Sequence, residues 1–183
     1  VFSANFIHSD EVEEVVVQAS ILNVTQDEIG DPLHILSGTD VSDLGTASLG
    51  ETLDSLLGVT TSDYGSAVGQ PIIRGLSGSR VKILTNGLVN RDVAGIGADH
   101  KNEVDLSDIQ QIEVVRGPSS LLYANGASGG IVNIVDNTIA TSDIEKRLFK
   151  LGFETQSVTS GDGQSFSVAD NLGGLNLYFS YSD

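Results

Sequence analysis

An aspartate and a histidine, Asp99 and His100, stand side by side in a polar, glycine-containing stretch. Carboxylate oxygen and imidazole nitrogen are both good zinc ligands, and adjacent residues on a loop can converge on one ion. Lys101 places a positive charge directly after the pair, whereas Glu103 and Asp105 supply negative charge nearby. Since two protein ligands do not close a zinc site, a metal here would need further ligands from elsewhere, and an Asp-His pair on a solvated loop is also common without any metal.

Groups that would indicate an enzyme are missing from the sequence. The chain has no cysteine, which excludes a thiolate nucleophile, a thiolate metal site and a disulfide framework. No spacing of serine, histidine and aspartate suggests a nucleophilic triad, and residues 126–130 match neither the P-loop nor the dinucleotide-binding motif. We therefore predict no enzymatic activity.

The composition is that of a folded protein. Hydrophobic residues make up 39% of the 183 residues and charged residues 19%. The net charge of −16 argues against nucleic acid or anionic lipid as a partner, because both require a basic face. No run of about 18 apolar residues occurs, so the sequence predicts no transmembrane helix.

The polar stretch that carries Asp99 and His100 spans 90–104 and is expected to be a loop between two strands. Loops on a rigid scaffold are where binding residues concentrate. The following stretch, 105–136, holds two apolar runs, 112–115 and 131–135, which are rich in β-branched residues and predict strands. Between them Pro118 suits the first position of a single helical turn, and glycines then return the chain to a strand.

Other elements follow from local patterns. Ser48 and Glu51 form a capping box that predicts a helix, which ends at Gly58. Its apolar face would hold Leu49, Leu53, Leu56 and Leu57. Strands are predicted at 32–36 and 59–64, and a hairpin at 80–89 around the tight-turn pair Asn86-Gly87.

The order of residues in the organising stretch is distinctive. Residues 112–118 read IEVVRGP, Leu122-Tyr123 follows, and residues 126–134 read GASGGIVNI. This order closely resembles the segment that closes the plug domain of TonB-dependent outer-membrane receptors. Residues 70–75, which end in Ile-Arg-Gly, resemble a second strand of that plug. A generic strand-turn-strand unit of a soluble α+β protein is the alternative.

By this resemblance Val15, Val16 and Val17 form the TonB box, the periplasmic segment that is grasped by TonB with its inner-membrane energising complex. An extended apolar tripeptide can add to the edge of a partner's sheet, with backbone hydrogen bonds giving affinity. Without the resemblance, the same three valines read equally well as an ordinary first strand of the fold.

The resemblance also assigns roles to charged residues. It places Arg74 and Arg116 on the outer surface of the plug, where their guanidinium forks would pair with carboxylates of the barrel wall and anchor plug to barrel. The Asp99-His100 pair is similar to that of the zinc-uptake members of the family, which lies in the corresponding plug loop. The flanking Gly97 and Lys101 depart from those members.

The C-terminal part has a different pattern. Apolar and polar residues alternate over 147–158 and 175–182, and 166–168 continues the alternation after a turn expected at 161–163. Alternating segments of about ten residues separated by turns are typical of transmembrane β-barrels. By resemblance these are the first three of roughly 22 barrel strands, so we expect the chain to be a fragment of a transporter.

The predicted fold is an α+β plug with a small mixed sheet, short helices and long loops, followed by antiparallel β-barrel strands. We divide the chain into an N-terminal extension (1–30), a plug (31–138) and barrel strands (146–183). The predicted function is TonB-dependent zinc transport across the bacterial outer membrane by a monomer whose barrel contacts lipid. One alternative is an Fe(III)-siderophore or haem receptor of the same family. A siderophore site usually uses aromatic and arginine side chains, whereas 90–104 offers Arg91 but no aromatic ring. The other alternative is a soluble periplasmic cation-binding module.

Overall fold

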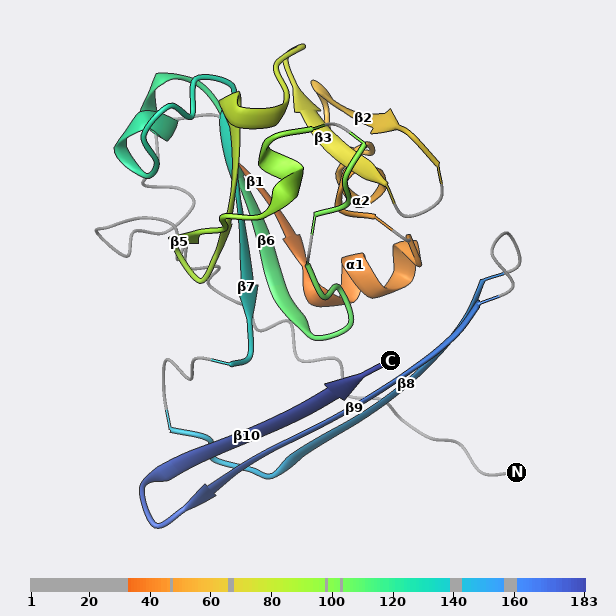
Figure 1. Cartoon of the computed structure of the whole chain (residues 1–183). Helices are drawn as coiled ribbons and strands as arrows, with labels where there is room; N and C mark the ends of the chain where they lie inside the picture. Colours follow the sequence, from red (N-terminus) through yellow and green to blue (C-terminus); the bar gives the residue numbers. More distant parts are fainter. Residues whose placement is uncertain are drawn as a thin grey trace, which may run out of the picture.

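Two groups of strands, one in a mixed α+β unit and one in a long antiparallel sheet, make up the described chain (Figure 1). The predicted partner segment Val15–Val17 lies outside the described residues, and the domain boundaries proposed above stay predictions. The computed structural model describes residues 33–46, 48–65, 68–97, 99–102, 104–138, 143–156 and 161–183.

A five-stranded mixed sheet forms the centre of the first unit, with the order β1-β6-β7-β4-β5. Strand β4 runs parallel to β7, and the other neighbours are antiparallel. The two strands predicted from β-branched runs are β6 and β7, side by side at the centre. The strands are β1 (Leu33–Ser37), β4 (Val81–Thr85), β5 (Leu88–Val89), β6 (Ile109–Val115) and β7 (Gly130–Asp136).

A separate hairpin and two short α-helices complete this unit. The hairpin consists of β2 (Val59–Asp63) and β3 (Gly69–Ile73). Helix α1 (Gly38–Leu44) was not predicted, although Ser37 and Asp40 form a capping box at its start. Helix α2 (Leu49–Leu53) is capped by Ser48 as predicted. Among the described residues, the 3₁₀ turns η2 (Gly78–Arg80), η3 (Val93–Gly95) and η4 (Pro118–Leu122) lie in the connections.

The predicted extent of the second helix is wrong. Helix α2 ends at Leu53, and Asp54 then accepts a hydrogen bond from the backbone N–H of Thr61 at 3.1 Å. Leu57 is 84% exposed instead of facing the core. A contact that sequence periodicity does not reveal therefore redirects the chain into β2 after only five helical residues.

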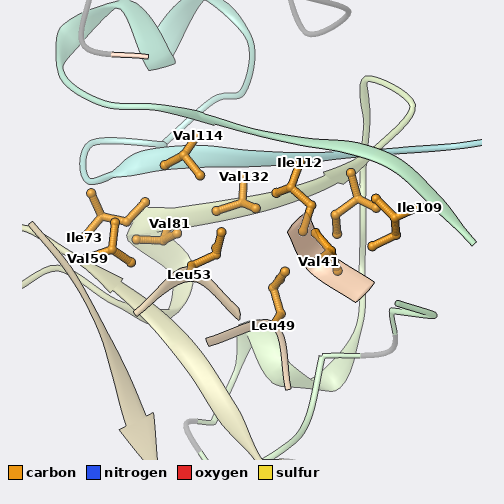
Figure 2. Packing of buried hydrophobic residues seen from close by; sticks show 11 residues of the cluster. Val41, Leu49, Leu53, Val59, Ile73, Val81, Ile109, Ile112, Val114 and Val132 are labelled. Atoms are coloured by element: carbon orange, nitrogen blue, oxygen red, sulfur yellow. The ribbon is translucent and has the colours of Figure 1, made fainter. Parts of the chain in front are cut away.

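The main core lies between one face of the mixed sheet, the two helices and the β2–β3 hairpin. Figure 2 shows its side chains pointing into one shared space. Leu53, Ile73 and Ile112 have no measurable exposure. Each such side chain contributes about 1.5–3 kcal/mol by leaving water, so this core fixes the sheet. A second cluster on the opposite face contains Leu84, Val115, Ala124, Ala127 and Ile131.

A buried polar network ties the central strands together. The carboxylate of Glu113 in β6 is fully buried and accepts hydrogen bonds from Gln111 (2.7 Å) and from Asn133 in β7 (2.9 Å). The side-chain oxygen of Asn133 in turn accepts from the backbone N–H of Gly87, at 2.9 Å. The network therefore joins β6 and β7 to the predicted Asn86-Gly87 turn, where both residues have positive φ.

The second group is an antiparallel meander of β8 (Leu148–Gln156), β9 (Gly161–Leu172) and β10 (Leu175–Ser182). Cross-strand partners place aromatic residues on one face. Phe149 and Phe166 meet edge to face with ring centroids 5.0 Å apart, and Phe179 lies 6.2 Å from Phe166. Glycines 161 and 163, expected in a turn, instead belong to β9.

Much of the apolar side-chain surface of this meander is exposed, as alternation predicts for barrel strands. Phe149 is 62% exposed, Leu151 64% and Phe179 59%. Together with the mixed sheet, these strands confirm the predicted fold class. No helix among the described residues has the length and apolar character needed to cross a membrane.

Candidate functional site

The 90–102 loop, which follows β5, carries the predicted metal pair. It contains η3, whose N-cap Asp92 accepts a hydrogen bond from the backbone N–H of Gly95 at 3.2 Å. After η3 the chain turns again, and the N–H of His100 approaches the carbonyl oxygen of Gly97 at 3.4 Å. The loop therefore contains two successive tight turns, and Asp99 and His100 lie in the second of them.

The structure brings Asp99 and His100 together at the surface. His100 Nε2 lies 3.8 Å from Asp99 Oδ1, and the side chains are 50% and 71% exposed, respectively. This separation is longer than a hydrogen bond, so the two atoms lie close together without being bonded to each other. The arrangement suits two ligands of one cation.

Gly97 lies directly beneath the pair. A Cβ atom at this position would stand 2.6 Å from Asp99 Oδ1 and 3.2 Å from His100 Cδ2. The φ angle of Gly97 is outside the left-handed region, so glycine is required here for space rather than for backbone conformation. The absence of a side chain at Gly97 therefore leaves room for the side chains of Asp99 and His100.

The described residues do not complete a metal site. Within the described ranges, no three or more histidine, cysteine, aspartate or glutamate residues lie close enough together to hold a metal ion. Asp105, a candidate to offset Lys101, is engaged elsewhere, because its Oδ1 accepts from the N–H and hydroxyl of Ser107 at 2.9 and 2.6 Å. Within the described ranges, Asp99 and His100 therefore have no third ligand of these types grouped with them.

Arg116 is not on the outer surface of the plug as expected, because it is buried at 8% exposure. Its guanidinium donates to the carbonyl oxygen of Leu57 and contacts His34 Nε2. Burial, and then the nearby positive charge of Arg74, lower the pKa of Arg116. Its Nε is buried and lacks a hydrogen-bond partner among the described residues.

Arg74 lies at the exposed end of β3 in a left-handed backbone conformation, with φ of 51°. Its charge acts on Arg116, so the structure brings the two predicted anchoring arginines into electrostatic contact. Two like charges next to each other favour a carboxylate as their common partner.

His34 of β1 carries no functional signal in the sequence, but its contact with Arg116 gives it a structural role. Burial, and then the charge of Arg116, lower the pKa of His34 below 6.5. The folded plug therefore favours neutral His34, and this contribution to stability is complete above about pH 6.5 and is lost as pH falls through the lowered pKa.

Acidification from about pH 7.5 to pH 5.5 is therefore expected to loosen β1 in the full-length protein. We expect the amide hydrogens of Leu33–Ser37 to exchange several-fold faster at the lower pH, after correction for intrinsic exchange. His34→Gln, which keeps a hydrogen-bond acceptor but does not titrate, should abolish this difference. Equal pH dependence in the variant would contradict the assignment.

Two aspartates connect the mixed α+β unit to the antiparallel strands. Lys150 of β8 lies 3.0 Å from Asp108 Oδ1, and Asn137 donates to the same oxygen at 2.9 Å. Ser182 of β10 donates to Asp105 Oδ2 at 2.7 Å. Sequence analysis missed both contacts, because isolated acidic residues carry no pattern that reveals a distant partner.

Asp105 is held in its charged form by these contacts. Burial alone would raise the pKa of its carboxyl, but hydrogen bonds from Ser107 and Ser182 outweigh burial and hold the pKa below its ordinary value. The contact with β10 therefore persists at neutral pH with Asp105 ionised.

Comparison with known proteins gives a family match and a fold match. The model of the TonB-dependent receptor plug domain matches residues 25–131, more than half of the chain. The siderophore receptor PirA from Acinetobacter baumannii is similar in structure, with a TM-score of 0.63 and 21% identity over 82% of this chain and 24% of that chain. The ferric yersiniabactin uptake receptor FyuA from Yersinia pestis is also similar in structure, with a TM-score of 0.63 and 20% identity over 83% of this chain and 23% of that chain.

The copper transporter OprC is also similar, with a TM-score of 0.61 and 19% identity over 75% of this chain and 21% of that chain. The chain thus spans about a quarter of the length of these solved structures. The family comprises receptors and transporters of the bacterial outer membrane, in which a plug lies inside a β-barrel and the N-terminus faces the periplasm. The chain therefore belongs to the TonB-dependent receptors of the outer membrane, and consists of a plug domain followed by barrel strands.

Proposed function

We propose that the full-length protein transports zinc ions across the outer membrane, with Asp99 and His100 as the plug's ligands to the ion. The observation that carries this proposal is the 3.8 Å approach of the two exposed donor atoms over Gly97. Imidazole and carboxylate together suit zinc, and a transported ion must be bound by ligands that can also release it. An open, two-ligand half-site on the plug meets that requirement.

The ligands that complete the site would come from the rest of the barrel. A four-coordinate zinc ion needs about two further donors. Plug movement would then separate the two sets of ligands and free the ion. Zinc is here the cargo of the transporter, so weak binding by either half alone is consistent with function.

Energy would enter through the N-terminal segment. Val15, Val16 and Val17 are proposed to pair with the edge of TonB's sheet, so that force from the inner membrane pulls on the plug. The outer membrane holds no ATP, which makes the proton-motive force of the inner membrane the source.

Other parts of the proposal concern how plug and barrel fit together. Arg74 and Arg116 are proposed to anchor the plug to carboxylates of the barrel wall, with Arg74 as the exposed member of the pair. The exposed apolar residues of β8–β10 are proposed to face lipid. The domain division at 1–30, 31–138 and 146–183 belongs to the same proposal.

A ferric siderophore is the second candidate cargo. PirA is named as a siderophore receptor and FyuA as a ferric yersiniabactin uptake receptor, although their identity to this chain of 20–21% carries only the fold. Radiolabelled zinc and a radiolabelled ferric siderophore should be offered separately to cells that carry the full-length protein. Saturable zinc uptake without siderophore uptake is expected, whereas siderophore uptake alone would replace zinc as the cargo.

A further inference from the structure

One buried side chain on β3 holds three carbonyl groups of the 90–102 loop. Gln70 is 4% exposed, and its Nε2 lies 3.1 Å from the carbonyl oxygen of Ala94, 2.9 Å from that of Gly97 and 2.7 Å from that of His100. These three residues follow one another at intervals of three, so the loop wraps around a single amide group.

Gln70 is itself held from the opposite side. Its backbone N–H donates to the hydroxyl of Ser62 in β2 at 3.1 Å, and that hydroxyl approaches the carbonyl oxygen of Gln70 at 3.4 Å. The β2–β3 ladder pairs the same two residues. The amide therefore extends from a rigid hairpin into a loop that has no strand partner of its own among the described residues.

Electrostatics explains why one amide controls this loop. Three carbonyl oxygens that point toward one position repel one another, and a shared donor between them removes that repulsion. The amide supplies two N–H groups at that position. Within the loop the N–H of Ile96 donates to Val93 at 2.9 Å, but the turn contacts made by the N–H groups of Gly97 and His100 are each 3.4 Å long. The contacts from Gln70 to the carbonyls of Gly97 and His100, at 2.9 and 2.7 Å, are shorter than these two.

We propose that Gln70 is the positioning residue of the metal pair, an inference that rests on the proposed function. By fixing the carbonyls of Gly97 and His100, it sets the backbone on both sides of Asp99 and holds the two donor side chains over Gly97. Gln70 does not touch the ion. It determines whether the two ligands meet.

The test compares zinc uptake by full-length wild type, Gln70→Leu and Gln110→Leu. Leucine has nearly the volume of glutamine but no donor, and Gln110 is an exposed residue of β6 that serves as the matched control. We expect Gln70→Leu to raise the KM for zinc about 10-fold, in line with other residues that orient metal ligands. The maximal rate per folded transporter should stay unchanged.

A raised KM with an unchanged maximal rate distinguishes a positioning role from a general loss of structure. A merely structural Gln70 would reduce the amount of folded transporter, which lowers the maximal rate at unchanged KM. If Gln70→Leu does not reach the outer membrane, Gln70→Met carries the test, because methionine also lacks the N–H donors and its flexible side chain has a similar length. Unchanged KM in the variant that folds overturns the inference.

Amide hydrogen exchange tests the same inference without zinc. In Gln70→Leu we expect faster exchange at Gly97 and His100, with unchanged exchange in β6 and β7. Faster loop exchange together with no zinc uptake by the wild type would remove the proposed cargo but keep the positioning role. Zinc uptake that needs Asp99 and His100, together with unchanged loop exchange in Gln70→Leu, would remove the positioning role but keep the cargo.

Discussion

Alanine at both Asp99 and His100 is expected to weaken zinc binding to the purified full-length protein by more than about 100-fold, because replacing residues that merely orient metal ligands already costs 10–100-fold. The two side chains are exposed and outside the core, so the fold should be unaffected. Isothermal titration with zinc, in detergent, measures the loss.

Two glycines of the same loop supply graded controls. Gly97→Ala keeps both ligands but puts a methyl group 2.6 Å from Asp99 Oδ1, so the carboxylate must move and affinity should fall about 10-fold. Gly95→Ala meets nothing within 4 Å and should bind like wild type. Equal affinity in all variants would show that zinc, if bound, lies at another site.

Gly38→Ala is expected to destabilise the plug by about 3 kcal/mol, the upper end for an overpacked position. A Cβ atom at Gly38 would stand 2.1 Å from the carbonyl oxygen of Ile109. Gly38 begins α1, and Ile109 begins the central strand β6, so backbone must shift in one of them. A shift of this size should speed global-opening exchange of β6 and β7 amides about 100-fold.

The control for this prediction is again Gly95→Ala, whose added methyl group has open space. Both substitutions replace glycine by alanine at positions without positive φ, so unfolded-state entropy changes alike in the two. A difference between them therefore reports the contact with Ile109. Exchange of β6 and β7 within about twofold of wild type in Gly38→Ala would show that α1 does not pack as described.

Much of the fold follows from local sequence signals. The two strands predicted from β-branched runs are observed as β6 and β7, and the predicted Asn86-Gly87 turn connects β4 and β5. Alternation in the C-terminal part became β8–β10. These elements were predictable because their period or turn chemistry is contained in a few neighbouring residues.

Long-range contacts account for what the sequence did not reveal. The shortening of α2 depends on Asp54 and Thr61. Beyond the end of this helix, the carbonyl oxygen of Leu57 accepts a hydrogen bond from Arg116, 59 residues away. Likewise, Gln70 meets a loop that lies 24 to 30 residues further along the chain. None of these partners shares a local motif with the residue it contacts.

The candidate site was predictable only in part. Adjacent ligands at Asp99 and His100 are visible in the sequence, and the structure places them on an exposed loop within 3.8 Å. The residues that bring them there, Gly97 below and Gln70 behind, are uncharged and carry no signal of metal binding. The roles of Gly97 and Gln70 follow only from their distances to the pair and its backbone in the structure.

Energised zinc uptake tests the central claim most directly. Cells with full-length wild type or with Asp99→Ala/His100→Ala take up radiolabelled zinc in the presence or absence of the TonB energising complex. We expect saturable uptake that requires both the pair and the energiser. Energiser-dependent uptake of zinc that is indifferent to the pair would contradict the assigned ligands, and energiser-dependent uptake of a ferric siderophore or haem without zinc would contradict the cargo.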